Sequence, residues 1–144
     1  MFQFTYPAKI KKDEAGFFLV TFPDIPFAAT DGETMAEALE EARDCLEEAI
    51  AVSIAENLDF PLPSSIRKRH HSIPLTARMS AKAALYIAVR ATGINKSARA
   101  RRLGVDEKEI RRMFSPRHQT KLPRIEQALL VLGYQLSVSL RKAA

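Results

Sequence analysis

The sequence has a single cysteine, and none of its apolar runs is long enough to cross a membrane. Cys45 has no partner for an internal disulfide, and its helical spacing among small and apolar residues predicts a buried thiol. A membrane-spanning helix needs about 18 consecutive apolar residues, so no membrane partner is expected. Residues 1–11 alternate apolar and polar side chains, unlike the charged and then apolar start of a secretory signal. We therefore expect a globular protein of the reducing cytoplasm.

Signatures of catalysis and of cofactor binding are also scarce. The chain has no glycine-rich loop of the kind that holds phosphates, and it has no nucleophile-elbow motif. His70 and His71 are adjacent in a basic run, and His118 is remote from both, so the histidines lack the spacing of metal ligands. The sequence therefore predicts no metal and no cofactor, and it favours a protein that is not an enzyme.

Charge is divided unequally along the chain. Residues 1–66 carry four Lys/Arg against thirteen Asp/Glu, a net charge of −9, whereas residues 67–144 carry eighteen against four, a net charge of +14. A basic half predicts a polyanionic ligand, and nucleic acid is the usual one in the cytoplasm. The acidic half would repel the same ligand, so it is expected to bind a basic protein.

The acidic half has the pattern of three strands, a helix and a fourth strand. A first, half-buried strand is predicted by the alternating apolar residues Phe2, Phe4, Tyr6, Ala8 and Ile10. Residues 12–16 form a polar turn, and the apolar run 17–22 predicts a central strand that completes a hairpin. Pro23 and Pro26 stop that strand, and residues 27–30 predict a short third one.

A long amphipathic helix is expected next. Thr34 and Glu37 have the spacing of a capping box, and apolar residues follow at intervals of three and four. These apolar residues are Met35, Ala38, Leu39, Ala42, Cys45, Leu46, Ala49 and Ile50. The opposite face is acidic, with Glu33, Glu37, Glu40, Glu41, Asp44, Glu47 and Glu48. This face is either a solvated helix surface or a surface that attracts a basic partner.

Prolines and a change of charge mark the boundary between the halves. Pro61 and Pro63 end the helical pattern, and a basic run begins at Arg67. Residues 72–76 predict a short strand that returns to the first sheet, which places the junction near Arg78. We therefore expect an acidic domain over residues 1–78 and a basic, mainly helical domain over residues 79–144.

The basic domain carries the spacing of a helix-turn-helix motif over residues 94–114, after a helix that Ser80 caps and that Thr92 and Gly93 end. Ala100 is the small residue that allows the two helices to approach, and Gly104, four residues later, takes the positive φ of the turn. The apolar positions of the motif are filled by Leu103, Val105, Ile110 and Met113.

Two further features concern the ends and the packing of these helices. Asp106 and Glu109 have the spacing that caps the second helix. Arg99 occupies a position where leucine is usual, so either its aliphatic stem is buried or Ala98 takes the buried place.

If residues 107–114 form the recognition helix, its exposed residues reach base edges in the major groove of operator DNA. These residues are Glu107, Lys108, Arg111 and Arg112. We expect Arg111 and Lys108 to contribute most, because Glu107 also suits a helix N-terminus without any ligand. Phosphate contacts, which set affinity and salt dependence, are expected from Lys96, Ser97, Arg101, Arg117, His118 and Lys121. Such a protein is nucleoid-associated when it is bound to its operator.

The C-terminal residues predict a helix and a strand. Pro123 begins the helix and Gly133 ends it. Over residues 135–141, Leu136, Val138 and Leu140 alternate with polar residues, which predicts a final strand. A lone strand needs a partner, and the same strand of a second copy supplies one. The resulting homodimer, or a higher oligomer built from it, would present two recognition helices to a palindromic operator.

The order of these features resembles the HicB family of bacterial antitoxins over nearly the whole chain. The resemblance rests on Gly16 in the hairpin turn, Phe22–Pro26 (FPDIP), Thr30–Thr34 (TDGET) before the acidic helix, and Pro61–Ser64 (PLPS) after it. The C-terminal helix-turn-helix marks a subset of that family. One departure is Phe27, where the family usually has glycine.

The resemblance implies an α+β protein with two roles. A β-β-β-α-β domain with a partial RNase H-like fold would bind a HicA-like toxin, a small mRNA-cleaving protein, and block its active site. The helix-turn-helix domain would repress the protein's own operon. Toxin contacts are then expected from the acidic residues Asp24, Glu40, Asp44 and Glu47. A toxin that holds RNA is basic, which suits the charge of the first half.

Three alternatives remain open from the sequence. An RNase H-like nuclease would use carboxylates to hold magnesium, and the candidates near turns are Asp13, Glu14, Asp24 and Asp31. All of these except Asp24 are ordinary turn residues, and their spacing does not require three to converge. A repressor that senses a small molecule, without a toxin, is the second alternative. RNA binding by the basic half is the third, although that half lacks interleaved aromatic residues for stacking.

Overall fold

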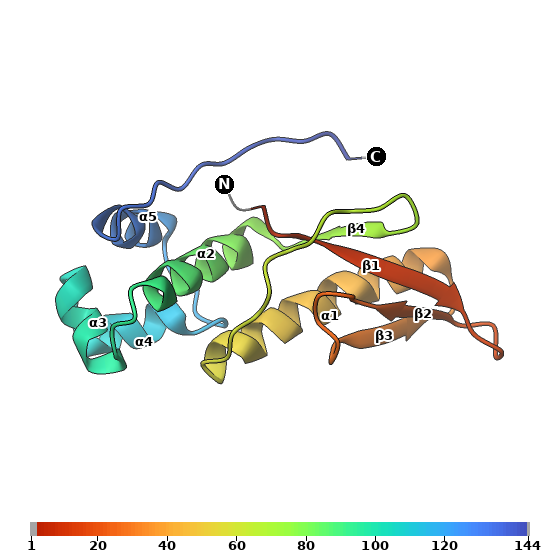
Figure 1. Cartoon of the computed structure of the whole chain (residues 1–144), viewed down its shortest axis with the longest axis horizontal. Coiled ribbons are helices and arrows are strands. Elements are labelled where there is room, and N and C mark those ends of the chain that lie inside the picture. Colours follow the sequence, from red (N-terminus) through yellow and green to blue (C-terminus); the bar gives the residue numbers. More distant parts are fainter. Residues whose placement is uncertain (1–2, 144) are drawn as a thin grey trace. The chain divides into compact units, whose positions relative to one another are not determined.

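A computed structural model describes residues 3–143 of the chain. The fold is α+β: an antiparallel sheet comes first, and most of the helices follow it (Figure 1). The chain divides into two compact units, Met1–Ser80 and Ala81–Ala144. Phe2, which was assigned to the first strand, lies outside the described residues.

Four strands form the sheet of the first unit. They are β1 (Thr5–Lys12), β2 (Phe18–Thr21), β3 (Ala29–Gly32) and β4 (His71–Pro74), in the spatial order β3-β2-β1-β4 with antiparallel neighbours. The burial predicted for β1 is confirmed at Phe4, Tyr6 and Ala8, but the strict alternation is not, because Pro7 is also buried and Ile10 is only half-buried. The interior position predicted for the second strand is also confirmed, because β2 lies between β1 and β3.

The third strand begins two residues later than the predicted 27–30. After β2 the chain makes two successive turns, in which the Ile25 amide donates to the Phe22 carbonyl and the Ala28 amide donates to the Ile25 carbonyl. Together these turns span residues 22–28, which include both prolines, and they leave Phe27 with 66% of its surface exposed. Pairing with β2 can start only where they end, at Ala29.

Helix α1 (Met35–Ala55) packs against β2, β3 and β4 (Figure 1). The Thr34 hydroxyl accepts from the Glu37 amide as predicted, whereas the Glu37 carboxylate accepts from the Glu33 amide, one residue before the cap. The predicted buried face is confirmed at Ala38, Ala42, Leu46, Ala49 and Ile50. Met35 was wrongly assigned to that face, because it stands at the helix start with 37% of its surface exposed.

Cys45 on α1 is half-buried, so the prediction of a buried thiol is confirmed only in part. Its Sγ donates to the Ala29 carbonyl of β3 over 3.6 Å. Burial, and second to it the charge of Glu41, raise the pKa of the Cys45 thiol. The side chain therefore behaves as a small apolar group with a weak hydrogen bond that ties α1 to the sheet.

Gly32 ends β3 at a point where the backbone of α1 comes close. A Cβ atom at this position would lie 2.4 Å from the Ala38 nitrogen and 2.8 Å from its Cα. These are backbone atoms, so the helix itself would have to shift. We expect Gly32→Ala to lower the free energy of unfolding by about 1–3 kcal/mol, measured by urea denaturation. The neighbouring exposed change Asp31→Ala is the control, and equal stability of the two variants would contradict the steric argument.

Two boundaries near the junction differ from the prediction. β4 ends at Pro74 instead of residue 76, and α2 (Ala77–Ala91) begins before Ser80. The reason is Thr76, whose hydroxyl accepts from the Met79 amide and whose carbonyl accepts from the Ser80 amide. Thr76 is thus used to start the helix, and Ser80 lies within the first turns instead of capping them. The predicted end of the helix, at Thr92 and Gly93, is confirmed.

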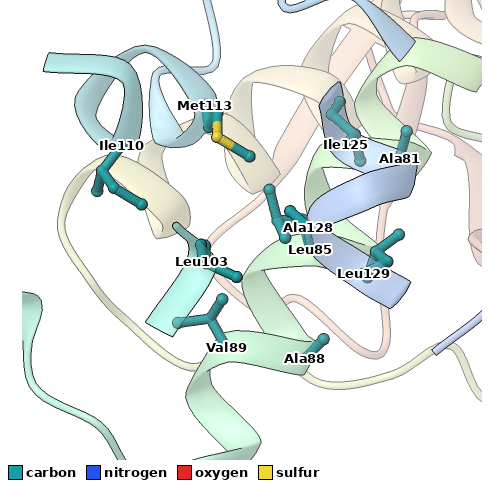
Figure 2. Close-up of a cluster of buried hydrophobic side chains, with 10 residues drawn as sticks. All are labelled: Ala81, Leu85, Ala88, Val89, Leu103, Ile110, Met113, Ile125, Ala128 and Leu129. Carbon is teal, nitrogen blue, oxygen red and sulfur yellow. The ribbon is translucent and has the colours of Figure 1, made fainter. Parts of the chain in front are cut away.

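The second unit contains the rest of α2, followed by α3 (Lys96–Leu103), α4 (Glu107–Phe114) and α5 (Leu122–Val131). The bounds of α4 are those predicted. Apolar side chains from all four helices meet in one cluster (Figure 2). The cluster consists of Ala81, Leu85, Ala88, Val89, Leu103, Ile110, Met113, Ile125, Ala128 and Leu129. It fixes which sides of α3 and α4 face inward.

The predicted final strand is not present in the single chain. Residues 134–143 have no regular secondary structure, although Leu136 packs against the apolar cluster. Val138 is 82% exposed and the Leu140 side chain is fully exposed. A strand forms only where another backbone supplies hydrogen-bond partners, and no strand of the described second unit does so.

Candidate nucleic-acid interface

Helices α3 and α4 are joined by the three residues Gly104–Asp106. Gly104 has φ 66° and ψ 30°, and its amide donates to the last turn of α3. A Cβ atom there would meet no atom within 4 Å, so the positive φ alone accounts for the glycine. The Val105 amide donates to the Ala100 carbonyl over 3.1 Å, which folds the chain back towards α4.

Side chains cap the N-termini of both α3 and α4. Asn95 Oδ1 accepts from the Ala98 amide at 2.9 Å, and Asp106 Oδ1 accepts from the Glu109 amide at 2.7 Å. The cap predicted for α4 is confirmed at Asp106. Ile110 and Met113 are buried, as the spacing predicted. The opposite side of α4 is therefore free to face a ligand.

Every residue predicted to contact DNA is exposed. On α4, Lys108, Arg111 and Arg112 are spaced by three and four residues and therefore share one face of the helix. Glu107 adjoins them in the first turn. The remaining residues lie at the start and middle of α3 and in the segment between α4 and α5: Lys96, Ser97, Arg101, Arg117, His118 and Lys121.

The charge of this unit is strongly positive. Residues 81–144 carry fourteen Lys/Arg and four Asp/Glu, a net charge of +10. Two of the four carboxylates have local roles, since Asp106 caps α4 and Glu109 lies 4.0 Å from the Nε atom of Arg124 on α5. The positive charges on the exposed face of α4 are thus largely uncompensated by these carboxylates, which favours binding of a polyanion.

The alternatives for Arg99 are resolved in favour of its own burial. Arg99 is 8% exposed, and its guanidinium lies 5.3 Å from the centre of the Phe114 ring. Its Nε is buried and has no hydrogen-bond partner within residues 3–143. Burial lowers the pKa of Arg99, the charge of Arg90 adds to this effect, and Tyr86 opposes it. Ala98 is only half-buried.

Sequence reasoning missed Lys82, which is 2% exposed although it is a lysine. Its Nζ reaches carbonyl oxygens at the end of α4 and the hydroxyl of Thr120. The available signal was its spacing, because Lys82 precedes the buried Leu85 by three residues and Val89 by seven. A lysine on an apolar stripe is rarely buried without partners for its charge.

The acidic residues proposed for a protein partner fall into two groups. Asp24 and Glu47 hold the first unit together: Asp24 Oδ2 accepts from the Ser64 amide at 2.9 Å, and Glu47 Oε1 accepts from the Thr76 amide at 2.8 Å. Glu40 and Asp44 are exposed and lie one turn apart on α1. The latter pair is the better placed to meet a partner.

Asp24 also lies near a buried tyrosine. The Tyr6 hydroxyl donates to the Pro61 carbonyl over 3.1 Å, which anchors the proline-containing segment to the sheet. Burial, and to a smaller extent the negative charge of Asp24, raise the pKa of Tyr6 well above its ordinary value. The tyrosine therefore remains a neutral donor at any physiological pH.

The described residues contain no candidate metal site and no candidate membrane span. Across residues 3–143, no three His, Cys, Asp or Glu side chains are grouped so that they could hold a metal ion. None of the helices in this range combines the length and the apolar character that a membrane span requires. Of the carboxylates considered for a nuclease, Asp13 accepts from the Phe17 amide in the hairpin turn.

Comparison with known proteins gave consistent matches. Residues 5–84 match the family model described as a HicB-like antitoxin of bacterial toxin-antitoxin systems. The chain is 36% identical over 133 residues to "Antitoxin HicB" of Escherichia coli (strain K12), covering 92% of this chain and 96% of that protein. "Antitoxin HicB 2" of Photorhabdus laumondii is 37% identical over 133 residues, covering 92% and 94%. "Antitoxin HicB" of Pseudomonas fluorescens (strain Pf0-1) is 28% identical over 132 residues, covering 91% and 90%.

Proposed function

Because the chain belongs to the HicB-like family of antitoxins of bacterial toxin-antitoxin systems, we propose that it binds and blocks a HicA-like toxin and represses its own operon. Residues 1–78 form the toxin-neutralising domain, with a partial RNase H-like fold. Residues 79–144 form a helix-turn-helix domain for DNA binding and dimerisation. The observation that carries the proposal is the opposite charge of the two halves, −9 and +14, in a chain of this family.

Charge and exposure support the toxin-binding half of the proposal. The family pairs an antitoxin with a toxin, and a toxin that cleaves mRNA has a basic surface with which to hold it. Glu40 and Asp44 present two carboxylates on adjacent turns of α1, facing solvent. Desolvated contacts between such carboxylates and toxin cations supply specificity and fast association. The β-β-β-α-β order of the first unit supports the RNase H-like assignment.

The short turn between α3 and α4 supports the DNA-binding half. The positive φ of Gly104 and the cap at Asp106 leave α4 with its apolar side inward and its basic side outward. In this proposal Lys108, Arg111 and Arg112 read base edges in the major groove, with Glu107 beside them. Backbone phosphates are held by Lys96, Ser97, Arg101, Arg117, His118 and Lys121.

Dimerisation through the C-terminal segment completes the proposal. Val138 and Leu140 are exposed apolar side chains in a segment whose backbone has no strand partner in the described second unit. Pairing with the same segment of a second copy would bury these side chains, and Leu136 already packs against the core beside them. A two-fold dimer then offers two α4 helices to two half-sites of a palindromic operator.

Co-expression tests the proposal as a whole. The full chain is expressed with the protein encoded by the adjacent reading frame, and growth and co-purification are measured. We expect the adjacent protein alone to arrest growth, and the full chain to restore growth and to co-purify with it. An adjacent protein without toxicity and without complex formation would contradict the antitoxin role and favour a repressor that responds to a small ligand.

Reversing the exposed acidic pair should disrupt toxin binding. In the double variant Glu40→Lys and Asp44→Lys, the two new cations would face the basic toxin, so we expect its dissociation constant to rise at least a hundredfold. Isothermal titration measures the change, and the matched control reverses two exposed acidic residues that are not part of α1, Glu14→Lys and Asp31→Lys. Equal loss in both double variants would point to net charge alone, and no loss in either would remove α1 from the interface.

A further inference from the structure

Lys82 is buried against the C-terminal end of α4, at 2% exposure. Its Nζ lies 3.3 Å from the Arg112 carbonyl oxygen, 3.3 Å from that of Met113 and 2.7 Å from that of Ser115. It also lies 3.1 Å from Thr120 Oγ1. Carbonyl oxygens can only accept hydrogen bonds, so the ammonium ion is the donor in each contact, and its three N–H groups are shared among four acceptor oxygens.

This position places a positive charge at the negative end of the dipole of the proposed recognition helix. The last four carbonyl groups of a helix have no partner within the helix, and the helix dipole places partial negative charge there. The Lys82 ammonium lies within hydrogen-bond distance of two of these carbonyls on α4, at Arg112 and Met113, and of the Ser115 carbonyl just beyond the helix. It therefore stabilises the end of α4 from which the following segment departs.

The same ammonium holds the segment that returns from α4 towards α5. Thr120 Oγ1 donates its single hydrogen to the Arg112 carbonyl over 3.2 Å, so it must accept from Lys82. His118 Nδ1 lies 3.1 Å from the same oxygen, in a hydrogen bond whose direction depends on the tautomer of the imidazole. The backbone amides of His118 and Thr120 donate within the segment. Lys82 is thus at the centre of a network that ties residues 115–120 to α4.

We propose that Lys82 is a positioning residue for DNA binding: it fixes α4 and the Ser115–Lys121 segment relative to each other, so that both meet one duplex. The inference rests on the proposed DNA-binding function. Lys82 is too buried to touch a phosphate, whereas Arg117, His118 and Lys121 on the segment are exposed. Lys82 therefore contributes to DNA binding indirectly, by positioning the residues that contact the duplex.

The test uses Lys82→Met in the full chain, because methionine keeps much of the stem and removes every N–H group. Binding to a duplex containing the promoter of the chain's own operon is measured by fluorescence anisotropy over a series of salt concentrations. We expect affinity at moderate salt to fall about tenfold. We expect the slope of log affinity against log salt to fall by about two, because each lost phosphate contact removes about 0.9. Lys11→Met, an exposed change of equal charge in the first unit, should leave both values unchanged.

The salt slope separates positioning from a purely structural role. A structural role would lower the melting temperature but leave the slope of the folded protein at the wild-type value, and that result overturns the proposal. If Lys82→Met does not fold, Thr120→Val takes its place, because it removes one side-chain hydroxyl through which the segment contacts Lys82. A lowered salt slope in this variant supports the proposal, and a wild-type slope overturns it. Failure of the wild-type chain to bind the duplex would instead overturn the DNA-binding function itself, and this inference with it.

Discussion

Arg111→Ala should weaken operator binding roughly ten- to hundredfold without changing toxin neutralisation. Arg111 is exposed on the basic face of α4, opposite the buried Ile110 and Met113. In the major groove, a guanidinium donates two hydrogen bonds to one guanine, and such a pair contributes about 1–3 kcal/mol of discrimination between bases. The alanine variant keeps a good helix former at an exposed position, so the fold should be unaffected.

The measurement compares the two activities in one variant. Operator affinity is determined by fluorescence anisotropy against the natural duplex and against one with altered half-sites, and neutralisation is scored by growth during co-expression with the toxin. Arg102→Ala is the matched control, because Arg102 is also exposed and helical but lies on α3 outside the proposed contact set. Loss of both activities by a folded Arg111→Ala protein would contradict the assignment of the two roles to separate halves.

The parts of the fold that depend on neighbouring residues could be predicted from the sequence. The bounds of α4 follow from Asp106 at its cap, the buried pair Ile110 and Met113, and the end of the apolar pattern at Phe114. The start of α1 at Thr34 follows in the same way. These signals lie within one or two turns of the residues they control, so the local sequence was enough to place these helix ends.

Distant contacts account for what could not be predicted. β3 is displaced because two turns after β2 delay its pairing, and α2 starts early because Thr76 caps it while its amide donates to Glu47, 29 residues away. The final strand is absent from the single chain, where the described second unit offers no strand for residues 134–143 to pair with. In each case the sequence pattern was present, but the position of the partner backbone decided the outcome.

Among the candidate contact residues, too, local patterns could be predicted from the sequence and distant contacts could not. The exposure of the proposed DNA-contact residues on α3 and α4 could be predicted from helical spacing, because exposure on a helix follows its periodicity. Asp24 and Glu47 were assigned to a toxin surface from charge alone, yet each holds a backbone amide of its own unit. Lys82 was missed because its partners, Arg112 to Thr120, follow it by 30 to 38 residues. Charge composition cannot distinguish a carboxylate that binds a partner from one that binds its own chain.

Replacing Arg99 with leucine should stabilise the second unit. Arg99 is 8% exposed, and its Nε has no hydrogen-bond partner within residues 3–143. An unsatisfied buried donor costs about 1–3 kcal/mol, more when it is charged, whereas its contact with the Phe114 ring returns about 1 kcal/mol. Leucine removes the buried donors and fills the position with the apolar group that is usual in this motif. We expect the free energy of unfolding to rise by about 1–2 kcal/mol and the melting temperature to rise by several degrees.

Thermal unfolding of three variants tests this expectation and separates its causes. Arg99→Met keeps a long unbranched stem, so it removes the charge with the least change in packing, and it should stabilise at least as much as Arg99→Leu. Arg102→Leu makes the same exchange at an exposed position of the same helix and should change stability by less than about 0.5 kcal/mol. A lower melting temperature for both Arg99 variants would mean that the cation is satisfied by its ring contact with Phe114. Higher stability together with weaker operator binding would mean that Arg99 contributes to DNA binding and lowers the stability of the fold. Burial disfavours the positive charge of Arg99, whereas a nearby phosphate would favour it.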